Sequence, residues 1–580
     1  MPKIEVNEKL FFSLLGRTYD YDELEERLTC GKAELDEKPD TTLSADERTI
    51  KIELNDTNRP DLWSTAGVAR QLRQHAGIGR PSSSRYAAYR EFFSDEKTTR
   101  DCGNRVVKVD PGLKDIRPYM AAFVISGKPI DEPMLLDIIQ TQEKLCWNFG
   151  RKRRSISMGV YRSANITWPI SYKAVDPDKT SFVPLACDAP MTCRQILTDH
   201  PKGKEYGFIL KDAPKFPLLT DAKNEVLSMA PIINSATLGA VQVGDSDLLV
   251  EMTGTDMPTL TLAVSIVACD FADAGYEILP VKVEHPYDTG FGKTVTTPYY
   301  FQKTASTTVG AANKLLGTEL TGVEVADALA KMGCESEIAG DRVTVRPPEY
   351  RNDFLHEVDI IEDVMMGKTL PWFKPSKPSD FTIGRLTPVT VFSRKAKSLM
   401  VGLGYQEMIF NYLGSGKDFI ERMNLAGTPQ GDAVIEISNP MTENFQFVRP
   451  SILPSLLAAE APSGNAVYPH RIFEIGKVAY REDSEVTGTR TRQNLGFLTA
   501  SSDANFNEAA SQVASLLYYL DHEYAVAESD DPRFIPGRQA AILVKGKRVG
   551  VFGEIHPQVL ENWTIGTPCA GGEIDLEELM

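Results

Sequence analysis

The chain has 580 residues, 42% of them hydrophobic and 25% charged, with a formal net charge of −17. This composition is typical of globular proteins, the length predicts roughly four domains, and the acidic balance excludes a basic surface over the whole molecule, although a local basic groove or a basic partner remains compatible with it. The eight cysteines show no CxxC spacing, the N-terminus is charged from Lys3 onward, and no apolar run reaches transmembrane length. We therefore expect reduced thiols, no structural zinc, no membrane association and a cytoplasmic location.

The first 80 residues predict a compact α/β unit. Thr49–Leu54 alternates apolar and polar residues with the period of a strand. Tyr21–Leu28 and Thr65–Gln74 have the pattern of helices, and Ser64 is a plausible N-cap for the second.

A Ser-rich, then charged segment at 81–105 is expected to be a connector, and 106–290 to be a β-rich domain. The apolar runs Ala121–Ile125 and Asp247–Met252 are typical of strands. The densest basic run is Arg151–Arg154. We interpret it as a solvated turn before a strand, the alternative being a phosphate contact.

Residues 298–370 predict a smaller α/β domain. Val309–Leu316 and Thr321–Met332 have helical patterns, and Arg342–Val345 that of a strand.

An acidic segment follows this strand. A helix from about Val358 places Asp359, Glu362 and Asp363 on one face, and Asp353 precedes it. Four hard oxygen ligands suit magnesium or calcium better than zinc. The alternative is a solvated acidic helix face.

The proline-rich run Pro371–Pro378 predicts a linker, and 380–580 a last domain. Phe392–Leu403 has a helical pattern, and Ala541–Val544 and Arg548–Phe552 read as strands. The sequence contains no phosphate-binding loop, HExxH or GxSxG motif.

A set of motifs runs through most of the chain in one order: Leu54–Ser64, His200–Gly203, Pro231–Ser235, Tyr350–Asp353, Val358–Asp363, Val401–Glu407, Ser438–Met441, Arg449–Pro454, Arg471–Gly476, Pro536–Arg538 and Gly553–Pro557. Together they resemble the β subunits of phenylalanine–tRNA ligase (phenylalanyl-tRNA synthetase), in the archaeal/eukaryotic-type form.

The resemblance implies an α+β multidomain fold. Its parts are an N-terminal α/β unit, a β-rich editing-like domain, a small α/β (winged/DNA-binding-like) domain and a class II synthetase-like antiparallel-sheet domain without catalytic residues. It also implies an α subunit as partner in an (αβ)₂ heterotetramer, which joins L-phenylalanine to tRNA(Phe) with ATP as substrate. The aminoacylation site is then on α. The alternatives are a free-standing nucleic-acid-binding module and an independent aminoacyl-tRNA hydrolase.

The resemblance further implies a Mg²⁺ site shared with α on Asp353, Asp359, Glu362 and Asp363. The spacing of the carboxylates and the resemblance thus favour metal on the same four residues.

The resemblance makes 106–290 an editing domain, which hydrolyses tyrosyl-tRNA formed in error. Its expected pocket residues are Pro231, Asn234, Ser235, Thr253 and Gly254. Relatives carry an acidic residue just after the Pro231–Ser235 motif, where this chain has Ala236, and the next carboxylate is Asp245. Editing is therefore weakened, dependent on a different acid, or absent.

Overall fold

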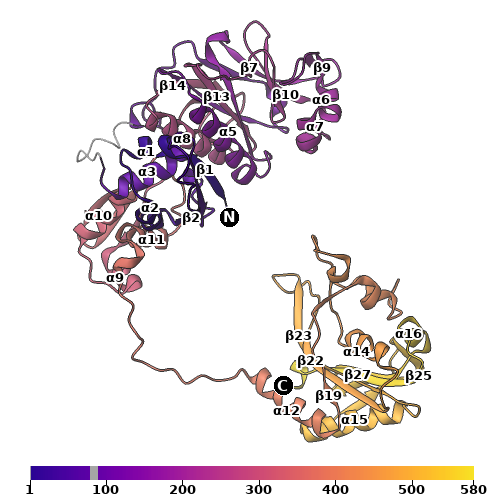
Figure 1. Cartoon of the computed structure of the whole chain (residues 1–580). Helices are drawn as coiled ribbons and strands as arrows, with labels where there is room; N and C mark the ends of the chain where they lie inside the picture. Colours follow the sequence, from indigo (N-terminus) through magenta and orange to yellow (C-terminus); the bar gives the residue numbers. More distant parts are fainter. Residues whose placement is uncertain (1, 79–88) are drawn as a thin grey trace. The chain divides into compact units, whose positions relative to one another are not determined.

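The computed structural model describes residues 2–78 and 89–580, which form two compact units of mixed α/β structure (Figure 1). Unit 1 comprises Met1–Ser376 and unit 2 comprises Lys377–Met580, so the division falls within the predicted proline-rich linker. In the described part of the chain, no helix is both long and apolar enough to cross a membrane.

Residues 81–88 of the predicted connector lie outside the described residues. Its remainder packs against unit 1 instead of forming a free linker. Phe93 is buried, and the Ser94 amide donates to Pro298 O at 2.9 Å.

The N-terminal part of unit 1 is a three-stranded antiparallel sheet in the order β1-β3-β2 with helices packed on it. Alternate residues of β3 (Ile50, Ile52 and Leu54) are buried, as the period predicts. The Ser64 hydroxyl accepts from the Gly67 amide at 3.0 Å and caps α3. The element bounds are β1 Lys3–Asn7, α1 Glu8–Leu15, α2 Tyr21–Leu28, β2 Ala33–Glu37, β3 Thr49–Leu54, η2 Pro60–Leu62 and α3 Thr65–His75.

A ten-stranded sheet forms the middle of unit 1, in the order β12-β11-β10-β7-β4-β14-β5-β13-β6, with β15 paired to β14. Both faces of β5 are buried: Phe123 lies in a core shared with α8, and Ala122 lies in a second core. This explains the continuous apolar run in its sequence. The strands are β4 Val106–Val109, β5 Tyr119–Ser126, β6 Ile156–Arg162, β7 Ile170–Val175, β8 Ser181–Phe182, β9 Met191–Thr192, β10 Phe216–Thr220, β11 Val226–Met229, β12 Ile233–Asn234, β13 Leu248–Gly254, β14 Glu277–Glu284 and β15 Thr294–Thr297. The helices are α5 Glu132–Lys144, η4 Leu145–Phe149, α6 Cys193–Asp199, α7 Pro201–Tyr206 and α8 Met257–Asp273.

The last part of unit 1 is a three-stranded sheet, β16-β18-β17, with three helices. The helix of the acidic segment begins at Glu357, one residue before the predicted start, because His356 caps it. The bounds are β16 Ala305–Thr308, α9 Val309–Leu316, α10 Gly322–Lys331, β17 Glu335–Ala339, β18 Arg342–Arg346 and α11 Glu357–Lys368.

Unit 2 is a seven-stranded sheet in the order β19-β22-β23-β27-β26-β25-β24, antiparallel except for the β19–β22 pair. Helices α12 and α15 share one core with the sheet, and α14 and α16 share another (Figure 1). The strands are β19 Gln406–Glu407, β20 Leu413–Gly414, β21 Phe447–Val448, β22 His470–Arg481, β23 Thr489–Ala500, β24 Ala525–Ala527, β25 Phe534–Val544, β26 Lys547–Ile555 and β27 Cys569–Asp575. The helices are α12 Pro388–Gly402, α13 Pro429–Asp432, α14 Leu453–Glu460, α15 Phe506–Tyr519 and α16 Pro557–Asn562.

All eight cysteines are free thiols. Six of them are buried, and only Cys102 and Cys187 are partly accessible.

Candidate functional site

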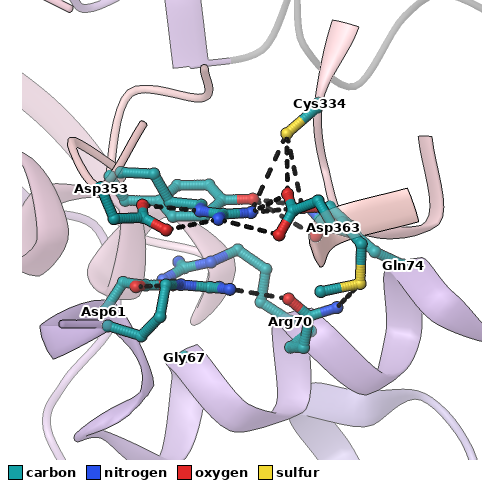
Figure 2. A network of polar contacts seen from close by, with 12 residues as sticks. Asp61, Gly67, Arg70, Gln74, Cys334, Asp353 and Asp363 are labelled. Atoms are coloured by element: carbon teal, nitrogen blue, oxygen red, sulfur yellow. Dashed lines mark hydrogen bonds and ion pairs between the residues drawn. The ribbon is translucent and has the colours of Figure 1, made fainter. Parts of the chain in front are cut away.

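The acidic segment is organised around a buried guanidinium. Arg351 donates to both oxygens of Asp353, at 3.0 and 2.6 Å, and to both oxygens of Asp363, at 2.6 and 3.1 Å. Figure 2 shows the two carboxylates converging in this network, with the Asp61 carboxylate in the layer beside it. Asp363 is only 4% exposed, so it does not share a solvated helix face with Glu362.

The other two carboxylates of the segment have different partners. Asp359 Oδ2 accepts from the amides of Leu355 and His356, both at 2.7 Å, and so closes the N-terminus of α11. Glu362 pairs with Lys32, which also pairs with Asp56.

Two cations of the chain, Arg351 and Lys32, pair with three of the four carboxylates of the segment. Burial opposes ionisation, yet Arg351 lowers the pKa of Asp353, whereas burial raises the pKa of Asp363 despite the same partner. Among the described residues, no three acidic, histidine or cysteine side chains are grouped as a metal site. The four carboxylates of this chain alone therefore do not fit Mg²⁺, which needs several oxygens around one point. The ion shared with a partner stays a prediction.

A cavity of about 290 Å³, here called the candidate pocket, opens in the middle of unit 1. It lies between α5, β6, β11, β12 and β13, and its wall includes Ile139, Arg153, Met158, Leu185, Ser228, Pro231, Asn234 and Glu251. The wall mixes apolar and polar residues, and the polar ones also include Gln142, Glu143, Ser157 and Lys202. Polar groups that converge on a cavity are typical of ligand sites.

Glu251 is the buried carboxyl of the candidate pocket, at 3% exposed. The Tyr161 hydroxyl donates to Glu251 Oε1 at 2.8 Å and also lies 3.3 Å from Asn234 Oδ1. Glu251 Oε2 has no hydrogen-bond partner in the described part of the chain. Burial raises the pKa of Glu251 to about 7.

Gly159 makes room for this pair. A Cβ at Gly159 would lie 2.2 Å from the Tyr161 hydroxyl oxygen and 2.5 Å from Glu251 Oε1. Any larger residue would push the two groups apart.

The five predicted pocket residues are only partly brought together. Pro231 and Asn234 line the cavity. Ser235 is buried and accepts from the Leu238 amide, and a Cβ at Gly254 would lie 2.6 Å from Ser155 O. Thr253 Oγ1 accepts from the buried Arg117 at 2.8 Å and does not line the cavity itself.

The sequence analysis missed Glu251. Asp245, the next carboxylate after Ala236, pairs with Arg162 and is not part of the pocket wall. The sequence did contain a signal for Glu251, which is the one carboxylate in the mostly apolar run of β13. An ionisable group is seldom buried without a role.

In unit 2, the charged residues of the strand motif that begins at Arg471 form ion pairs within the chain. Arg449 donates to both oxygens of Glu474, at 2.9 and 2.8 Å, and both side chains are buried. Arg471 pairs with Glu508 at 3.0 Å.

Comparison with known proteins gives consistent matches. The phenylalanyl tRNA synthetase beta chain CLM domain matches residues 374–576, and the tRNA synthetase B5 domain matches residues 306–368. The chain is 50% identical to a phenylalanine–tRNA ligase beta subunit of Treponema pallidum subsp. pallidum and 44% identical to one of Borrelia hermsii, each over 100% of both chains. The chain belongs to the phenylalanine–tRNA ligase β-subunit family.

A solved structure agrees with this assignment. An N-terminal fragment of the phenylalanyl-tRNA synthetase beta subunit from Pyrococcus horikoshii is 35% identical, covers 63% of this chain and 99% of its own, and superposes with a TM-score of 0.57. Both curated relatives named above are bacterial, so the archaeal/eukaryotic-type qualifier is not confirmed.

As a member of the phenylalanine–tRNA ligase β-subunit family, the chain is a component of an aminoacyl-tRNA ligase. The matches support neither a free-standing nucleic-acid-binding module nor an independent hydrolase. The acidic segment lies within the match to the B5 domain.

Proposed function

We propose that the candidate pocket is an editing site, at which this subunit hydrolyses tyrosyl-tRNA(Phe) formed in error. The observation that carries this proposal is the buried Glu251 carboxyl, whose Oε2 has no partner in the described residues and which lines a cavity of mixed apolar and polar residues.

The physical need for a second site comes from the limits of the first. An apolar phenylalanine pocket rejects an isostere with one added hydroxyl by only about 10²-fold. A second site that hydrogen-bonds the tyrosine hydroxyl prefers tyrosine over phenylalanine by about 10⁴–10⁵-fold, because bound phenylalanine leaves the polar group of the site unpaired. Glu251 Oε2 offers the acceptor that such a site requires.

Tyr161 positions the carboxyl. Its hydroxyl donates to Oε1, so Oε2 is the carboxyl oxygen that is buried without a partner in the described residues. Glu251 thus acts as the different acid that the sequence left open at Ala236.

We further propose that the chain assembles with an α subunit as an (αβ)₂ heterotetramer that charges tRNA(Phe) with phenylalanine at the expense of ATP. Unit 2 supports this, because seven large apolar side chains are more than three-quarters exposed: Phe381, Ile383, Ile409, Met441, Val467, Val486 and Tyr518. Exposed apolar groups in such number favour a protein partner. In unit 2 we assign no catalytic residue, since Arg471 and Glu474 are both held in ion pairs.

Two assays test the proposal. Co-expression with α, followed by size-exclusion chromatography with light scattering, is expected to give the heterotetramer. The purified complex is expected to hydrolyse tyrosyl-tRNA(Phe) faster than phenylalanyl-tRNA(Phe). Equal rates for the two esters, or no hydrolysis, would remove the editing assignment while leaving the ligase assignment intact.

A further inference from the structure

A strained basic turn lies directly beside the candidate pocket. Three consecutive residues that follow η4 have left-handed backbone: Arg151 (φ 50°), Lys152 (φ 56°) and Arg153 (φ 65°). Residues with side chains rarely adopt this conformation, and such strain concentrates at ligand sites. We call residues 151–154 the basic turn.

The basic turn is held rigidly from below. The buried Arg117 donates to Arg153 O at 3.1 Å and to Arg154 O at 3.0 Å. Arg153 in turn donates to the carbonyls of Pro231 and Ile232, both at 3.1 Å. The turn precedes β6, and its Arg151, Lys152 and Arg154 side chains are exposed, as predicted for a solvated turn. Arg153 nevertheless fixes it to the wall of the candidate pocket.

The charges of the basic turn are not neutralised. None of its four cations forms an ion pair with a carboxylate in the described part of the chain. The whole chain has a net charge of −17, so four consecutive cations without a carboxylate partner among the described residues form a local exception. Their natural counterpart is a polyanion.

Three of the four cations, Lys152, Arg153 and Arg154, lie over aromatic rings. Lys152 Nζ is 5.2 Å from the Trp147 ring centroid, and the Arg153 and Arg154 guanidinium carbons are 4.1 Å from that of Tyr206 and 5.0 Å from that of Phe208. The Trp147 side chain is 46% exposed and that of Phe208 is 38% exposed. Exposed rings interleaved with cations are what unstacked bases and their phosphates bind in single-stranded nucleic acids.

The basic turn also separates two cavities of unit 1. Trp147 and Arg151 line a polar cavity of about 1160 Å³, whereas Arg153 lines the candidate pocket of about 290 Å³. A single strand of nucleic acid that crosses the basic turn would thus lead from the larger cavity to the smaller one.

We propose that Trp147 and the basic turn form a stacking platform for the single-stranded 3′ end of tRNA, which delivers the terminal ester to the candidate pocket. This inference rests on the proposed editing function for its location. Binding of RNA to the platform is measured separately from hydrolysis of tyrosyl-tRNA.

The first experiment measures RNA binding by the α–β complex. The probe is a single-stranded RNA dodecamer that ends in CCA and carries a fluorophore at its 5′ end. Binding is measured by the fluorescence anisotropy of this label, which no substitution in the protein removes. Stacking of one base makes Trp147→Ala bind the probe about 5- to 150-fold more weakly. Trp147→Phe is expected to recover most of the affinity, because it keeps a ring.

Trp372→Ala is a matched control. Its ring is also 46% exposed and lies 5.1 Å from Lys368 Nζ, but Trp372 is remote in sequence from the basic turn. It is expected to bind the dodecamer like the wild type. An unchanged affinity in Trp147→Ala, or an equal loss in Trp372→Ala, would overturn the platform.

Charge and stacking are separated by a second probe. Polyphosphate has the charge but no bases, so Trp147→Ala should leave its binding unchanged, whereas Arg154→Gln should weaken both probes. In the RNA titration, Arg154→Gln should also reduce the slope of log K against log salt by about 0.7. An equal loss for polyphosphate in Trp147→Ala would contradict stacking.

Hydrolysis assays separate this inference from the editing function. Trp147→Ala is expected to raise KM for tyrosyl-tRNA(Phe) with little change in kcat and no change in phenylalanine charging. If the wild-type complex hydrolyses no tyrosyl-tRNA, the editing function fails, and the RNA titration still decides the platform. If editing is active and Trp147→Ala changes neither KM nor RNA affinity, only the platform fails.

Discussion

The Tyr161 hydroxyl lies 2.8 Å from Glu251 Oε1, and this bond orients the carboxyl, whose second oxygen is buried and has no partner among residues 2–78 and 89–580. The two residues are 90 positions apart in the chain and meet on neighbouring strands β6 and β13. Gly159 on β6 provides the space for their contact.

Glu251→Gln is expected to reduce the preference for tyrosyl-tRNA(Phe) over phenylalanyl-tRNA(Phe). A hydrogen bond to a charged group contributes about 1.5–3 kcal/mol, which corresponds to about a 10- to 150-fold change in the ratio of the two hydrolysis rates. The measurement is deacylation of both esters by the α–β complex. Glu143→Gln is the control, because Glu143 lines the same pocket but is exposed. The same loss in both variants would argue against a specific role for Glu251.

The preference for tyrosyl-tRNA is expected to depend on pH. Burial raises the pKa of Glu251 to about 7, so the carboxyl is increasingly ionised as pH rises through that value. The carboxylate is the stronger acceptor for a tyrosine hydroxyl, so the rate ratio should rise with pH around a midpoint near 7. Taking the ratio removes the intrinsic pH dependence of ester hydrolysis. A ratio that rises equally in Glu251→Gln would show that another group titrates.

Arg351→Met is expected to destabilise unit 1. Removing the guanidinium leaves Asp353 and Asp363 buried side by side, and breaking such a buried pair costs about 3–5 kcal/mol. Urea unfolding of the full chain measures the change. Lys32→Met is the comparison, because its ion pairs are partly exposed and contribute less than about 1 kcal/mol each. Equal shifts of the two urea midpoints would mean that the Arg351 network contributes no more to the free energy of unfolding than the Lys32 ion pairs do.

Magnesium is expected to have little effect on the chain alone. Its carboxylates are already bonded to Arg351, Lys32 and backbone amides, so adding EDTA should not change the unfolding midpoint. In the α–β complex, Glu362→Ala is expected to lower the bound magnesium measured by atomic absorption. Unchanged metal content in that variant would exclude Glu362 as a ligand.

Local patterns predicted the local structure well. The bounds of α2 and β3 agree with the helical and strand periods, and Ser64 caps α3 as expected, because each of these features depends on neighbouring residues. The environment of the acidic segment was not accessible in this way. Helical spacing placed Asp363 beside Glu362, but only the fold brings Lys32, 330 residues away, to Glu362.

The candidate pocket shows the same limit. Pro231 and Asn234, which the motif resemblance named, lie on the cavity wall. The resemblance could not show that the carboxyl of the pocket is Glu251 on β13. The contact between Tyr161 and Glu251 arises from the register between β6 and β13 and not from closeness in sequence.

The burial of the thiols makes the chain selectively reactive. Burial raises the pKa of six of them: Cys30, Cys146, Cys193, Cys269, Cys334 and Cys569. Alkylating reagents attack thiolates, so they should modify Cys102 and Cys187 first. Cys187 is two residues from Leu185 on the wall of the candidate pocket. With Cys102 replaced by serine, one fluorophore on the native Cys187 would therefore give a reporter near the wall of the pocket.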